Sequence, residues 1–115
     1  MIADEPSDPE DRKILTLARS ARARTGAAQG ACVRDTDGRT YAGASVRLPH
    51  LSLSALQVAV AMAVSSAAPG LEAAAVVADD DPTADDLAVL RDLPGTGVAV
   101  WRADASGAVQ SVVSL

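Results

Sequence analysis

The sequence predicts an α/β protein in which helices cover both faces of a five-stranded mixed sheet, a three-layer α/β/α sandwich. Helical and strand patterns follow one another in the order α-β-β-α-β-α-β-β. An opening hairpin followed by a strand–helix–strand crossover gives a sheet with both antiparallel and parallel pairs. A length of 115 residues allows one domain. We expect residues 8–115 to form it and the acidic, proline-containing residues 1–7 to form a flexible tail.

The first helix has sequence signals at both ends. Asp8 is a capping residue, and Pro9 suits the first helical position. Apolar side chains recur at helical spacing from Ile14 to Ala21, and the pattern stops at Thr25 and Gly26. We therefore predict a helix from position 9 to position 25.

The remaining elements are bounded by turn residues. The predicted strands are 29–35, 40–46, 73–78, 96–101 and 108–113, and the predicted helices are 52–66 and 83–93. The turn at Asp37-Gly38 joins the first two strands into a hairpin. Pro69-Gly70 and Pro94-Gly95 end the second and third helices.

The composition predicts self-association. Hydrophobic residues make up 49% of the chain, but 25 of them are Ala and none is Phe. Small side chains contribute little burial energy, since each buried CH₂ is worth about 0.8 kcal/mol, and a partner surface adds stability. The helix at 52–66 is apolar nearly all round, which is typical of a helix enclosed on every side. We expect a homo-oligomer, a dimer or a tetramer.

Charge and cysteine content exclude several classes. A net charge of −5 argues against a nucleic-acid partner, because phosphate binding requires clustered basic residues. The single cysteine, Cys32, cannot form an internal disulfide, and we expect a cytoplasmic protein. The longest apolar run, 53–64, is shorter than the ~17 residues that span a bilayer, so no membrane segment is predicted.

Local patterns from Gly26 to about Leu93 resemble the cytidine deaminase family. The resemblance rests on Gly30-Ala31, on the run Asp37-Gly38-Arg39-Thr40-Tyr41-Ala42-Gly43 and on the loop into the second helix. It implies the cytidine deaminase-like form of the α/β/α sandwich. It also implies that Ser45 and Arg47 stand where the family has an Asn and a Glu that hold the ribose of a nucleoside.

The same resemblance places unsuitable residues at the positions that carry the chemistry. The family opens its central helix with a zinc-binding Cys or His, an Ala and the catalytic Glu, and here these positions are Ser54, Ala55 and Leu56. The family's second motif, Pro-Cys-x-x-Cys, corresponds to Pro82-Thr83 through Asp86. A deaminase needs three zinc ligands and a proton-shuttling carboxylate. The resemblance therefore implies a degenerate member without metal, cofactor or catalytic residue.

Two functional interpretations follow. The first is a pseudoenzyme that acts as an oligomeric binding or interaction module, with another protein as a further partner. The second is a binder of a nucleoside, nucleotide or other small anion in the pocket left by the lost site. Its candidate residues are Ser45, Arg47, Ser54, Leu56, Gln57, Thr83 and Asp86.

Individual residues leave alternatives open. Arg47 either clamps an anion or fills the vacated site and pairs with a neighbouring Asp. Gln57 is a polar interruption of the apolar helix and suggests a hydrogen bond across a subunit interface. The acidic run 79–86 resembles a solvated helix entry more than a cation cage. A zinc-independent enzyme remains a third hypothesis, without an oriented nucleophile or cofactor motif in the sequence.

Overall fold

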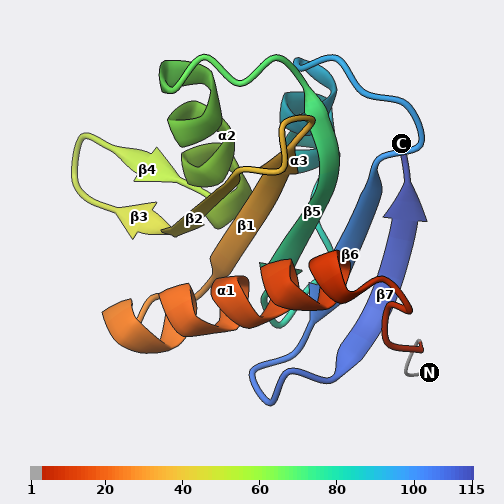
Figure 1. Cartoon of the computed structure of the whole chain (residues 1–115). Coiled ribbons are helices and arrows are strands. Elements are labelled where there is room, and N and C mark those ends of the chain that lie inside the picture. The colour runs from red at the N-terminus through yellow and green to blue at the C-terminus, as the bar shows by residue number, and fades with distance from the viewer. Residues whose placement is uncertain (1–3) are drawn as a thin grey trace.

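The computed structural model describes residues 4–115. Three helices and a five-stranded sheet form the domain, and a two-stranded hairpin precedes the second helix (Figure 1). In chain order the elements are α1 (Pro9–Thr25), β1 (Gly30–Asp35), β2 (Thr40–Ala44), β3 (Val46–Arg47), β4 (Ser52–Leu53), α2 (Ala55–Ser65), β5 (Leu71–Val77), α3 (Ala84–Arg91), β6 (Ala99–Ala103) and β7 (Val109–Ser114).

The sheet has the strand order β2-β1-β5-β6-β7. The pair β5–β6 is parallel and the other three pairs are antiparallel. Helix α1 packs on one face, while α2 and α3 pack on the other, so a separate apolar cluster lies on each face (Figure 1). The predicted three-layer α/β/α sandwich with a five-stranded mixed sheet is confirmed.

Helix α1 forms for the reasons visible in the sequence. The Asp8 carboxylate accepts from the Glu10 N–H at 2.9 Å, and Pro9 stands at the first helical position. Gly26 closes the helix in the left-handed conformation, with φ 67°, which glycine adopts at little cost. The face with Ile14 and Ala18 is buried against the sheet.

Small residues allow α1 to lie close to the sheet. A Cβ added at Gly30 would collide with the Ala18 carbonyl oxygen and come within 2.6 Å of the Arg22 nitrogen. Three consecutive alanines, 73–75, occupy the middle of β5, which is buried on both faces. Small residues at these positions therefore permit close helix–sheet packing.

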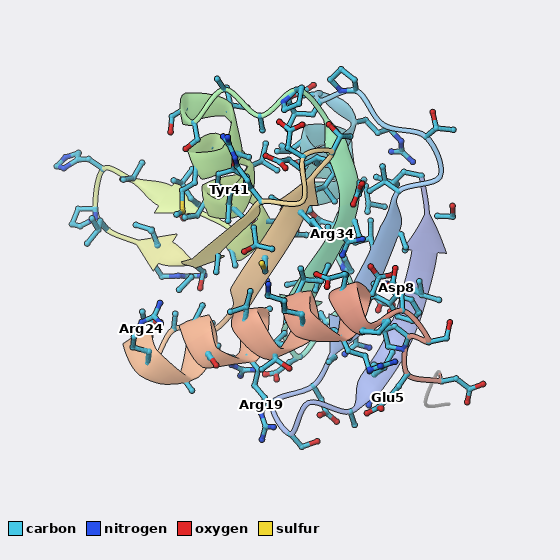
Figure 2. The ribbon with its side chains drawn as sticks, viewed as in Figure 1. Glu5, Asp8, Arg19, Arg24, Arg34 and Tyr41 are labelled. Carbon is cyan, nitrogen blue, oxygen red and sulfur yellow. The ribbon has the colours of Figure 1, made fainter. Side chains whose placement is uncertain are left out.

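A charged network also ties α1 to the sheet, and its central residue, Arg34, is labelled in Figure 2. The Arg34 guanidinium contacts a carboxylate oxygen of Asp11 at 2.9 Å and of Glu72 at 2.8 Å. The second oxygen of Asp11 accepts from the Trp101 indole N–H at 3.2 Å. Because the network joins α1, β1, β5 and β6, it fixes the helix across the centre of the sheet.

Several predicted boundaries were wrong between positions 40 and 66. The strand predicted over 40–46 ends at Ala44, and β3 pairs with β4 through Val46 and Leu53. The helix predicted from 52 begins only at Ala55, because the Ser54 side chain caps it. The segment predicted as a loop, around positions 49 and 50, is therefore the tip of a short hairpin.

The C-terminal strands lie close to their predicted positions. Strand β6 starts at Ala99 rather than at position 96, since Gly97 adopts φ 63° in the preceding turn. Residues 1–3 of the predicted tail lie outside the described residues, and Pro6 is buried. A flexible segment 1–7 stays a prediction. Within residues 4–115, no helix is long and apolar enough to cross a membrane.

Candidate functional site

The N-termini of α2 and α3 meet at one point. Ser54 caps α2: its hydroxyl accepts from the Gln57 N–H at 3.1 Å, and the Gln57 side chain accepts from the Ser54 N–H at 2.8 Å. Thr83 and Asp86 cap α3 in the same reciprocal way, at 3.1 Å and 3.4 Å. Each helix therefore starts with a complete capping box.

A short hydrogen bond joins the two caps. The Ser54 hydroxyl donates to one carboxylate oxygen of Asp86 at 2.6 Å, across 32 positions of sequence. Asp86 is only 5% exposed. Its negative charge is stabilised by the hydroxyl, by the Thr83 N–H and by the positive end of the α3 dipole. We call the side chains of Ser54, Thr83 and Asp86 the cap junction.

Gln29 adds a third contact that the sequence did not indicate. Its side-chain oxygen accepts from the Ala55 N–H at 3.2 Å and so satisfies a free donor in the first turn of α2. Its backbone N–H donates to the Ser45 hydroxyl at 3.1 Å. Gln29 and Ala55 are 26 positions apart, and no local pattern signals this contact.

Leu56 lies in the core. It is 1% exposed and belongs to the apolar cluster that also contains Val76 and Leu90. The predicted pocket residues therefore separate into groups. Leu56 packs in the interior, Gln57 serves the α2 cap, and Thr83 with Asp86 forms the α3 cap.

Ser45, Arg47 and Ser54 line one cleft of about 600 Å³, which we call the α2 cleft. Its walls come from the segment after α1, from β3 and from the residues that lead into α2. Arg47 is exposed, and no carboxylate of residues 4–115 lies within ion-pair distance of it. Leu56, Gln57, Thr83 and Asp86 do not line this cleft.

The donor set does not fit zinc. Two of the three side chains in the cap junction are hydroxyls, which are poor zinc ligands, and only Asp86 offers a carboxylate. Residues 4–115 contain no cluster of three His, Cys, Asp or Glu side chains able to hold a metal ion. The single histidine, His50, is exposed at the β3–β4 tip. The carboxylate of Asp86 is already satisfied by hydrogen bonds.

Cys32 is buried in the core. Its side chain is 0% exposed in the cluster beneath α1. Burial is the main cause that raises the pKa of its thiol to about 11, so the thiolate is scarce at neutral pH.

The acidic run after β5 makes structural contacts. Asp81 accepts from the Ser111 hydroxyl at 2.7 Å and from Arg102 at 2.8 Å, and these two contacts lower its pKa. Asp79 lies 3.5 Å from Arg22. Asp79 and Asp81 therefore connect this segment to α1, β6 and β7.

Comparisons with known proteins give one family. The family model described as "Cytidine deaminase-like" matches residues 7–107, while no curated protein matches the chain.

Solved structures give the same fold. The crystal structure of cytidine deaminase from Burkholderia pseudomallei has a TM-score of 0.77 at 22% identity, over 89% of this chain and 90% of that one. The cytidine deaminase from Mycobacterium tuberculosis has a TM-score of 0.70 at 24% identity, over 81% of this chain and 85% of that one. The cytidine deaminase from Mycobacterium leprae has a TM-score of 0.72 at 18% identity, over 93% of this chain and 94% of that one. The chain belongs to the cytidine deaminase-like family, as a degenerate member without the zinc ligands and the catalytic glutamate.

Proposed function

We propose that the protein is a non-catalytic relative of cytidine deaminases that acts as an oligomeric binding or interaction module. One observation carries the proposal. Where the family binds zinc and moves a proton, this chain has a hydrogen-bonded cap junction and a leucine packed in the core.

The chemistry of deamination supports this inference. Activation of water requires a metal held by several ligands, and proton transfer requires a carboxylate beside the base. Asp86 cannot serve as that carboxylate while it accepts from Ser54 and Thr83. Leu56 carries no ionisable group, and it does not reach the α2 cleft.

The exposed face of α2 supports self-association. Ala61, Met62, Val64 and Ser65 are exposed, and α2 contains no charged residue. Met62 is 40% and Val64 54% exposed. The sequence predicted a helix enclosed on every side, but in a single chain only one side is covered. We propose a second copy as the occupant, because an uncharged face lets two chains of net charge −5 approach with little repulsion.

Metal analysis and an activity assay test the catalytic part of the proposal. We expect the purified protein to contain far less than one zinc per chain and to leave the absorbance of cytidine unchanged, with or without added zinc. Stoichiometric zinc together with conversion of cytidine to uridine would disprove it.

Sedimentation tests the oligomer. We expect Met62→Asp to shift the protein to the monomer, because a charge on α2 must be desolvated at the interface. Val112→Asp is the matched control, since Val112 is 46% exposed on β7 and away from α2. A monomeric wild type at high concentration, or equal effects of both substitutions, would contradict the proposed surface.

A specific observation favours a second function, the binding of a nucleotide or another small anion in the α2 cleft. No acidic residue lines this cleft, and Arg47 does. A thermal-shift screen with nucleosides and nucleotides tests it, because a ligand of the folded state raises Tm. We expect Arg47→Ala to abolish the shift and Arg39→Ala, at an exposed turn, to preserve it.

We also propose that the protein is cytoplasmic and has no nucleic-acid partner.

A further inference from the structure

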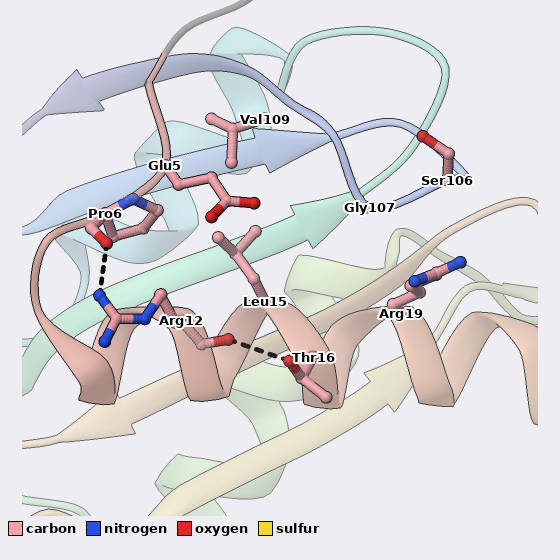
Figure 3. A pocket seen from close by; sticks show the side chains of 9 residues that line it. All are labelled: Glu5, Pro6, Arg12, Leu15, Thr16, Arg19, Ser106, Gly107 and Val109. Atoms are coloured by element: carbon pink, nitrogen blue, oxygen red, sulfur yellow. Dashed lines mark hydrogen bonds between the residues drawn. The ribbon is translucent and has the colours of Figure 1, made fainter.

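A second hollow lies between α1 and the turn that joins β6 to β7, and it shares no residue with the α2 cleft (Figure 3). It has a volume of about 270 Å³. Leu15 and Val109 contribute apolar surface, while Glu5, Arg12, Arg19 and Gly107 contribute polar groups or backbone. We call it the α1 pocket.

Two guanidinium groups of the α1 pocket lack an acidic partner. Acidic residues outnumber basic ones by 15 to 10 in this chain. Nevertheless, no carboxylate of residues 4–115 lies within 4.0 Å of Arg12 or Arg19, while Arg22, Arg34 and Arg102 are all paired. The pocket therefore keeps positive charge that the acidic surface does not neutralise.

The backbone fixes Arg12 in place. Its guanidinium donates to the carbonyl oxygens of Pro6 at 2.9 Å and Ser7 at 2.8 Å. Carbonyl oxygens orient a guanidinium without cancelling its charge. Preorganisation of this kind reduces the entropy that a ligand loses on binding.

A glycine makes room for Arg19. A Cβ at Gly107 would lie 3.2 Å from the Arg19 Nη1 atom, and Gly107 has φ 91°. A larger residue would be strained there and would press on the guanidinium. The glycine thus leaves the Arg19 side chain space over the β6–β7 turn, at the edge of the pocket (Figure 3).

The hydroxyl groups nearby are already used as donors. Thr16 donates to the Arg12 carbonyl at 3.2 Å, and Ser106 donates to Asp104 at 2.6 Å. Asp104 itself accepts from N–H groups of its own turn. The side-chain donors left for a ligand are therefore the N–H groups of Arg12 and Arg19, and the complementary ligand is an oxyanion.

We propose that the α1 pocket binds the phosphate group of a small phosphorylated molecule, with Arg19 as the principal contact. Arg12 lies seven residues earlier on the same helix, about 10.5 Å along its axis, and attracts the anion electrostatically. Arg12, Arg19 and Glu5 sum to a formal charge of +1, which favours a multiply charged phosphate over a carboxylate. Leu15 and Val109 line the pocket with apolar groups that suit the carbon part of the ligand.

Calorimetric titration with inorganic phosphate at constant ionic strength tests this site. We expect Arg19→Ala to weaken binding about tenfold or more, as loss of a charge-assisted pair does. We expect Glu5→Gln to tighten binding by roughly twofold to fivefold, because it removes a like charge from the rim. Arg24→Ala is the matched control on the same helix, outside the pocket (Figure 2), and should change the affinity by less than about twofold.

The other outcomes overturn the proposal. The first is that the wild type shows no binding at about 20 mM phosphate, a concentration at which even a weak anion site would bind. The second is that Arg19→Ala and Arg24→Ala weaken binding equally. Weaker phosphate binding by Glu5→Gln would contradict a site in which Glu5 is a like charge beside the bound anion. Succinate that binds as tightly as phosphate would remove the preference for phosphate. Arg47→Ala, in the α2 cleft, should leave this titration unchanged, so the two sites fail or succeed separately.

Discussion

Leu56→Glu restores the carboxylate that the family uses for proton transfer, and it should destabilise the protein without creating activity. Leu56 is 1% exposed among apolar neighbours. A carboxylate at this position would lie in the core, because Leu56 does not line the α2 cleft. The expected loss is one of folding stability.

The magnitude follows from burial. Truncation of a buried leucine to alanine costs about 3 kcal/mol, and an unpaired buried carboxylate adds roughly 3 kcal/mol or more. Small domains are stable by only about 5–15 kcal/mol. Since 1 kcal/mol corresponds to about 4–6 °C in a domain of this size, Leu56→Ala should lower Tm by roughly 12–18 °C. Leu56→Glu should lower it further or prevent folding at pH 7.

Thermal unfolding followed by circular dichroism measures this effect, and Gln57→Glu is the control. Gln57 is half-buried, and its side-chain oxygen accepts from the Ser54 N–H at 2.8 Å. A glutamate keeps that contact and places negative charge at a helix N-terminus, so its stability should stay within about 1 kcal/mol of the wild type. Equal Tm values for Leu56→Ala and the wild type would refute the packed core at this position.

The pH dependence gives an independent check. Burial raises the pKa of a glutamate at position 56 above its unfolded value of about 4.3. A raised pKa means that the folded state binds the proton more tightly, so the stability of Leu56→Glu should fall as pH rises above about 4.3. If the stability difference between Leu56→Glu and the wild type is the same at pH 8 as at pH 4, the new carboxylate is solvated and the reasoning is refuted.

Three further predictions test the surrounding structure. Burial alone would raise the pKa of Asp35, but hydrogen bonds from the Arg39 N–H, the Tyr41 hydroxyl and the Asp37 N–H lower it below 3.8. The ionised carboxylate therefore stabilises the fold above that pH, and this stability is lost as the pH falls. Asp35→Asn should flatten the acid limb of a stability–pH curve, and an unchanged curve would contradict this. The pKa of Cys32 is raised from 9.0 to about 11, so it should have about 100-fold less thiolate than an ordinary thiol. It should react with a thiol reagent only after unfolding, and rapid labelling of the native protein would contradict its burial. Gly30→Ala should cost about 3 kcal/mol or more by chemical denaturation, because a Cβ there meets the α1 backbone, whereas equal stability would refute that close approach.

The helices and strands were largely predictable because their signals are local. The Asp8 cap, the first-position proline and Gly26 define α1 in both sequence and structure. The hairpin of β1 and β2 is set by a turn in which Asp35 accepts from two backbone N–H groups. A capping residue or a turn acts within about four positions, so the chain itself displays it.

The candidate site was less predictable because its contacts are remote in sequence. Patterning shows that Ser54 can cap a helix, but not that its hydroxyl reaches Asp86. The resemblance placed Leu56 beside Ser45 and Arg47 in one pocket, whereas the structure separates a core residue from cleft residues. The β3–β4 hairpin was missed because each strand has only two residues, too few for an alternating pattern.

The cap junction links two helices that are remote in sequence. The hydrogen bond from Ser54 to Asp86 joins the N-termini of α2 and α3, and under the proposed function it takes the place of a metal link. Such a bond to a charged acceptor contributes about 1.5–3 kcal/mol, less than the apparent 10–16 kcal/mol of a structural zinc site. The remaining stability must come from packing, which agrees with a leucine at the catalytic position and with an apolar α2. Because Leu56 contributes to that packing, a carboxylate at this position would oppose folding.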